Sequence, residues 1–99
     1  MSLEIPITFT GHHIDVTEPL REFTTKKFER LTRHFGRIVD INVTFEVVKL
    51  SQIAKATINA AGKTFHADSS SNNMYESVDS LVDKLDRQIN EHNKREHEH

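Results

Sequence analysis

Two segments of this chain concentrate lysine and arginine side chains that could bind phosphates. Residues 18–37 are locally basic, although the whole chain carries a formal net charge of -2. Residues 73–95 combine cations with a larger share of acids. Each lysine or arginine contact with a phosphate backbone releases counterions and adds affinity that does not depend on base sequence. The distribution of charge therefore makes a polyanion a candidate partner that the net charge alone would not suggest.

Helical-wheel positions separate these cations from the acids. At about 100° per residue, the cations of the first segment fall on one flank of an apolar stripe, and Glu22 and Glu29 lie further round. In the second segment Lys84 and Arg87 share one flank, and the aspartates fall towards the other. If the two helices packed side by side, the basic flanks could join into one groove or ridge. The alternative is that these are solvated border cations paired with nearby acids, as Arg87 is spaced to pair with Glu91.

Other kinds of chemistry find little support in the residues. The chain has seven histidines, but adjacent His12 and His13 cannot easily share one ion, and no cysteine or HExxH motif accompanies them. His66 is expected on a solvated strand face, opposite in direction to Phe65. No nucleophile or pocket is indicated beside the acids of the second segment. We therefore expect no metal, no cofactor, no small-molecule substrate and no enzymatic activity.

Length and composition bound the class of protein. The chain has 99 residues, 35% of them hydrophobic, and no cysteine, which fits one small domain in a reducing compartment. No signal peptide or stretch of membrane-spanning length is visible. We expect a cytoplasmic protein with no membrane partner, in which residues 1–95 form a single domain and residues 96–99 a frayed tail.

Apolar periodicity predicts four strands and two helices. Alternation predicts a strand from Leu3 to Phe9, and Gly11 is expected to end it. Thr17 is the expected N-cap of the first helix, with Pro19 tolerated in the first turn. The remaining elements are a helical stripe from Leu20 to Phe35, strands over 39–47 and 54–60, a short strand opened by Phe65 and Ala67, a polar linker over 68–73, and a second helical stripe from Met74 to Ile89 whose cap is Asn72 or Asn73.

These elements predict an α+β fold with the order β-α-β-β-β-α. Strands two to four are joined by short turns and should be antiparallel, whereas the helical crossover makes the first strand parallel to a neighbour. Each strand has one apolar face and each helix one apolar stripe. The expected architecture is therefore a two-layer sandwich, with two helices packed on one face of a four-stranded sheet and the other face exposed to water.

Three segments resemble the short ribosome hibernation-promoting factors of bacteria, a family that also includes the ribosome-associated inhibitor A proteins. They are TGHHIDVTEPLREF (Thr10 to Phe23), FHA (Phe65 to Ala67) and NMYESVDSLVDKLDRQI (Asn73 to Ile89). The last resembles the family pattern DMYxAIDxLxDKLxRQL, and asparagine stands in place of the first aspartate. The residues that match the pattern are Met74, Tyr75, Asp79, Leu81, Asp83, Lys84, Leu85, Arg87 and Gln88. The tail KREHEH is more acidic than the lysine-rich tail expected of the family, which puts RNA contacts by the tail in doubt.

The resemblance implies a fold reminiscent of double-stranded RNA-binding domains. It also implies binding to the small ribosomal subunit and its rRNA, in the mRNA and tRNA channel near the A and P sites. Translation would be blocked and inactive ribosome dimers promoted in stationary phase, beside a separate ribosome modulation factor in some bacteria. By position, the resemblance implies RNA contacts at Lys27, Arg30, Lys84, Arg87 and Lys94. The charge pattern adds the neighbouring cations Arg21, Lys26 and Arg33.

Three alternatives stay open at this point. An inhibitor A-type protein would fill the same site but prevent dimerisation. A protein-interaction module would use the solvated sheet face or an edge strand. A small hydrolase would need a deep pocket.

Overall fold

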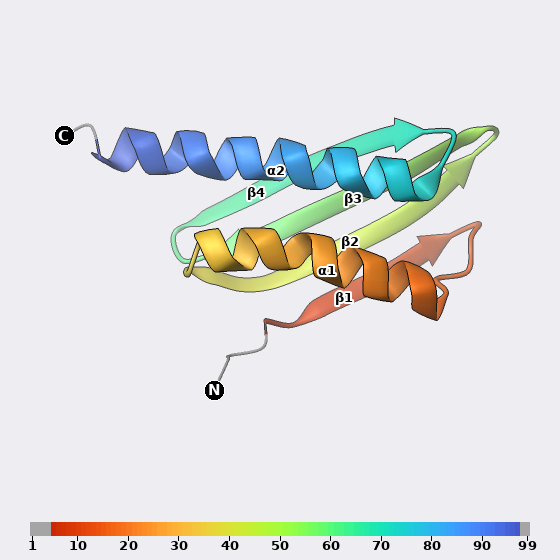
Figure 1. The fold of residues 1–99 in the computed structure, drawn as a ribbon, viewed down its shortest axis with the longest axis horizontal. Coiled ribbons are helices and arrows are strands. Elements are labelled where there is room, and N and C mark those ends of the chain that lie inside the picture. The colour runs from red at the N-terminus through yellow and green to blue at the C-terminus, as the bar shows by residue number, and fades with distance from the viewer. Residues whose placement is uncertain (1–4, 98–99) are drawn as a thin grey trace.

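The predicted order of elements is confirmed in the computed structural model, which describes residues 5–97 (Figure 1). Both helices cover the same face of one four-stranded sheet, so the predicted two-layer α+β architecture is confirmed as well. The elements are β1 (Ile7–His12), α1 (Glu18–His34), β2 (Ile38–Val48), β3 (Ser51–Ala60), β4 (Lys63–Ser71) and α2 (Met74–His97).

The strands lie in the order β1-β2-β3-β4. β1 pairs parallel with β2 through the α1 crossover, as predicted, and the other two pairings are antiparallel. Two-residue turns join the antiparallel strands, and each contains one residue with positive φ, Lys49 at 57° and Gly62 at 78°. Tight turns of this kind suit the right-handed twist of neighbouring strands. α1 therefore lies over the β1 side of the sheet and α2 over the β4 side (Figure 1).

The apolar stripes of both helices and the inner face of the sheet form one core. Its fully enclosed members include Phe28 and Leu31 on α1, Phe45 on β2, and Leu81 and Leu85 on α2. The outer sheet face carries polar side chains, as predicted. There, Thr57 Oγ1 lies 3.2 Å from His66 Nδ1. In the described part of the chain, neither helix combines the length and the hydropathy needed to cross a membrane.

Side chains at the predicted positions cap both helices. Thr17 Oγ1 accepts a hydrogen bond from the Leu20 N–H at 3.4 Å, and Pro19 lies in the first turn of α1. Asn73 Oδ1 accepts from the Tyr75 N–H at 2.8 Å at the start of α2. These acceptors satisfy backbone donors that have no partner inside the helix.

Two predictions about the sheet were wrong. Val39 was expected on the buried face, but a register irregularity between Ile38 and Asp40 turns it outward, and it is 58% exposed. Residues 68–71 were expected in a linker, but they extend β4 as far as Ser71. Their small polar side chains are typical of a turn. Their backbone nevertheless pairs with the first residues of β3, and this antiparallel pairing makes them part of the strand.

The ends of the predicted elements also shift. β1 continues through Gly11 to His12, and Leu3 lies outside the described residues. α2 reaches His97, so the helix passes the expected domain limit at residue 95, while residues 98–99 of the expected tail lie outside the described part of the chain.

Gly11 permits a close approach that any other residue would obstruct. A Cβ atom at this position would lie 2.4 Å from the Ile14 carbonyl oxygen and 3.0 Å from Val16 Cγ2. We expect Gly11→Ala to lower the free energy of unfolding by about 1–3 kcal/mol, because overpacking against a backbone atom forces the loop to shift. Urea denaturation measures this change. Gly36→Ala is the control, since a Cβ atom at that position would have no neighbour within 4 Å; an equal loss in both variants would contradict the steric explanation.

Candidate nucleic-acid interface

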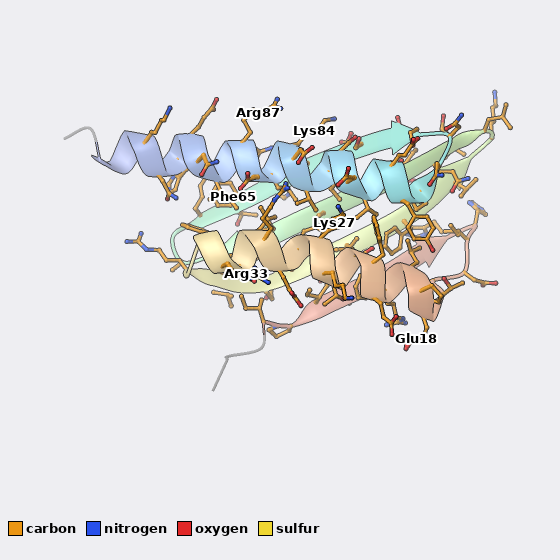
Figure 2. The ribbon with its side chains drawn as sticks, viewed as in Figure 1. Glu18, Lys27, Arg33, Phe65, Lys84 and Arg87 are labelled. Atoms are coloured by element: carbon orange, nitrogen blue, oxygen red, sulfur yellow. The ribbon has the colours of Figure 1, made fainter. Side chains whose placement is uncertain are left out.

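α1 and α2 form the helical layer of the sandwich and contain the predicted RNA-binding cations, of which Figure 2 labels Lys27, Arg33, Lys84 and Arg87. Lys27 lies between the two helices, whereas Lys84 and Arg87 lie along the border of α2 that is away from α1. The side chains of residue 34 and of residues 95–97 are outside the description.

Two ion pairs connect the helices. Lys27 Nζ lies 3.0 Å from Asp79 Oδ1, and Arg30 Nη2 lies 2.7 Å from Asp83 Oδ1. By accepting a hydrogen bond from the guanidinium, Asp83 raises the pKa of Arg30 above its ordinary value, and its negative charge adds to the effect. Arg30 is therefore charged at every physiological pH, and the aspartates fix the direction of both cations.

The two helices pack side by side, but their basic flanks do not join into the groove or ridge that the sequence suggested. α2 turns its aspartate flank towards α1, so the space between the helices contains alternating charges. Its basic flank lies on the other side, where Lys84 Nζ donates to the Asp68 carbonyl oxygen at 2.8 Å. A helical wheel gives the separation of two flanks, but the side on which the neighbouring helix packs is set by the sheet topology.

The remaining cations differ in their local partners. Arg21 lies 3.7 Å from Glu18 and stacks over the Phe9 ring, and Arg33 lies 3.6 Å from Glu29, so the alternative of border cations paired with nearby acids holds for these two. Among the predicted RNA-binding cations, the side chains of Lys26, Arg87 and Lys94 are exposed and form no ion pair or hydrogen bond within residues 5–33 and 35–94. The expected spacing of Arg87 and Glu91 does not produce an ion pair. These three side chains are the ones most available to an outside phosphate.

An aromatic pair between the helices was not foreseen. The rings of Phe23 and Tyr75 meet edge to face with centroids 4.8 Å apart, and Lys27 Nζ lies 5.5 Å from the Phe23 centroid. Tyr75 is 41% exposed, whereas the adjacent Met74 is buried. The partner of Tyr75 on α1 is set by the packing of the two helices.

The outer sheet face offers a weaker candidate site. A shallow hollow there is lined by Lys55, Thr57, His66 and Asp68, among others. Lys55 Nζ already lies 3.1 Å from Glu46 Oε1, and Thr57 is hydrogen-bonded to His66. Among the described residues no group of three or more potential metal ligands comes together.

Replacing Asp79 and Asp83 by asparagine tests the interhelical ion pairs. The four charged side chains are 38–57% exposed, and exposed pairs contribute roughly 0.2–1 kcal/mol each. We therefore expect the double variant to lose about 0.5–1 kcal/mol of unfolding free energy at low salt. Urea denaturation should show a smaller loss at high salt, where screening weakens the pairs. The same loss at both salt concentrations would indicate a cause other than charge.

The comparisons with known proteins concern the family and the fold of this chain. The family model described as "Sigma 54 modulation protein / S30EA ribosomal protein" matches residues 7–97. A ribosome hibernation promoting factor from Salmonella typhimurium is 41% identical over 86 residues, covering 87% of this chain and 90% of that protein. The predicted resemblance to the short hibernation factors is therefore confirmed.

Solved structures confirm the fold. A ribosomal subunit interface protein from Coxiella burnetii has a TM-score of 0.86 and 33% identity, covering 91% of this chain and 99% of that one. The N-terminal domain of Thermus thermophilus Protein Y has a TM-score of 0.79 at 21% identity, covering 88% and 96%, and shows likeness of fold alone. On the extent of the family match and the identity to these relatives, the chain belongs to the Sigma 54 modulation protein / S30EA ribosomal protein family.

Proposed function

We propose that this chain is a ribosome hibernation factor of the cytoplasm. It binds the small ribosomal subunit in the mRNA and tRNA channel near the A and P sites, blocks translation, and promotes inactive ribosome dimers in stationary phase. The observation that carries the proposal is the 41% identity, over 87% of the chain, to a protein named ribosome hibernation promoting factor. A separate ribosome modulation factor is a proposed partner, and the activity is binding rather than catalysis.

The exposed helical layer is the proposed rRNA-binding surface. Lys26 and Arg33 on α1 and Arg87 and Lys94 on α2 are exposed, and lysine and arginine are the side chains that bind phosphate oxygens. Lys27 and Arg30 lie deeper between the helices and keep more than a third of their side-chain surface exposed. In the proposal they add phosphate contacts while the aspartates hold them in position.

Sucrose-gradient sedimentation tests the proposal. The chain should co-sediment with purified small subunits, and its affinity should fall steeply between low and physiological salt, because each phosphate contact releases a counterion. Adding the chain to ribosomes from starved cells that lack it should enlarge the dimer peak when the modulation factor is present. Absence of the chain from the small-subunit fractions would contradict the proposal.

The same gradient separates the inhibitor A-type alternative. In that role the chain still co-sediments with small subunits, but the dimer peak shrinks on its addition. The change in the dimer peak therefore shows whether the chain promotes or prevents ribosome dimers, and co-sedimentation separately shows whether it binds.

A further inference from the structure

β4 forms one edge of the sheet. In an antiparallel pair every second residue points its N–H and C=O groups away from the neighbouring strand. On an edge strand such groups form a template to which another chain can add a strand. β4 is nine residues long and contains no proline, whereas the other edge, β1, has six residues and follows Pro6. Of the two edges, β4 is thus the longer template for strand addition.

Two side chains of α2 occupy this template. Lys84 Nζ donates to the Asp68 carbonyl oxygen at 2.8 Å, and Gln88 Nε2 donates to the His66 carbonyl oxygen at 2.8 Å. Four residues of an α-helix advance about 6 Å, and two residues of an antiparallel strand advance about 6.8 Å. The i, i+4 pair on α2 therefore matches two successive outward-pointing carbonyls of β4, which a strand from another chain would need as acceptors.

We propose that Lys84 and Gln88 close the β4 edge against strand addition by a second copy of this chain. A second copy is the occupant because every molecule carries the same nine-residue edge, and two such edges can pair antiparallel about a two-fold axis. Lys84 also places a positive charge at the edge, which disfavours the approach of an identical edge. The role is independent of ribosome binding, since it acts in the free protein.

A variant pair with matched composition tests this role. Lys84→Ala with Gln88→Ala removes both donors, and Arg87→Ala with Asn90→Ala removes one cation and one amide from the exposed surface of the same helix. In sedimentation velocity over a concentration series, we expect the first variant to approach twice the monomer mass while the control and the unchanged chain stay monomeric. The backbone amide signals of residues 63–71 should shift with concentration in the first variant only.

A third substitution distinguishes strand pairing at the β4 edge from nonspecific association. Ser70→Lys adds a lysine on the exposed side of β4, and edge lysines oppose strand pairing, so it should return the first variant to a monomer. A folded, monomeric Lys84→Ala, Gln88→Ala variant would overturn the proposal, as would association that Ser70→Lys does not reverse. If the double variant does not fold, Lys84→Met with Gln88→Met decides, because both substitutions keep a long side chain and together remove both donors. A folded Lys84→Met, Gln88→Met variant that stays monomeric across the series would then overturn the proposal.

Discussion

Reversing the charge of Lys26 and Arg87 together is expected to weaken binding to small ribosomal subunits by about 100-fold. Each residue would lose one hydrogen bond to a phosphate, which contributes roughly 1.5 kcal/mol. Since about 1.4 kcal/mol corresponds to a tenfold change in affinity, each loss weakens binding about tenfold. The two residues lie one on each helix and have no ion-pair partner in the described part of the chain. Lys26→Glu with Arg87→Glu should therefore leave the fold intact. The slope of log affinity against log salt should also become shallower, because fewer counterions are released.

Lys49→Glu with Lys63→Glu is the matched control for charge. It changes the net charge equally, and Lys49 in the β2–β3 turn and Lys63 at the start of β4 are exposed and have no ion-pair partner in the described part of the chain. Affinity within about threefold of the unchanged chain is expected for the control, since a general change of charge acts only over roughly a Debye length. If both pairs weakened binding alike, long-range attraction would explain the result and the helical layer would not be the contact surface. If neither did, Lys27 and Arg30 would be the next contacts to test.

The fold could be predicted because its determinants are local. Strand alternation, helical stripes and the caps at Thr17 and Asn73 depend on residues a few positions apart, and the order of elements and both caps were confirmed. The strand 68–71 and the outward turn of Val39 could not be predicted, because each depends on pairing with a distant segment. Serine and aspartate are poor strand formers in isolation, and tertiary pairing overrides that preference.

The candidate site could be predicted only as a set of residues. The wheel correctly separates Lys84 and Arg87 from the aspartates, and Figure 2 shows the two cations on the border of α2 away from α1. It could not show that Lys27 and Arg30 face Asp79 and Asp83, or that Lys84 bonds to a β4 carbonyl. Those partners come from helix placement over the sheet. The cations therefore divide into exposed, interhelical and edge-bound groups that the sequence presents as equivalent.

This division supports the proposal that a chain of net charge -2 carries a phosphate-binding surface. Asp79 and Asp83 are directed at α1, where they lie against Lys27 and Arg30, so they do not cover the outward cations. Negative charge between the helices restrains two long cationic side chains, which lowers the conformational entropy that binding must remove. Asp79 and Asp83 thus hold Lys27 and Arg30 in position on this surface.

Phe45→Ala is expected to lower the free energy of unfolding by about 4 kcal/mol, near the upper part of the range for large-to-small changes in a core. Phe45 is 0% exposed on β2, and its register partners are Gly11 on β1 and Ala54 on β3. Its ring stacks on Phe9 with centroids 6.0 Å apart. Because the register partners on both neighbouring strands have little or no side chain, they cannot fill the space that the ring leaves. A domain with a total stability of roughly 5–15 kcal/mol would then lie close to unfolding.

Val39→Ala on the same strand is the matched control, and it also tests the bulge. The alternating sequence places Val39 and Phe45 on the same face, but the irregularity at Ile38 leaves Val39 58% exposed. Truncation of an exposed side chain should change the unfolding free energy by less than about 0.5 kcal/mol. Urea denaturation of both variants, with unchanged m-values, measures the contrast. If Val39→Ala lowered the unfolding free energy as much as Phe45→Ala, β2 would keep strict alternation in solution and the bulge would be absent. If Phe45→Ala lowered it only slightly, the neighbouring side chains would close the cavity.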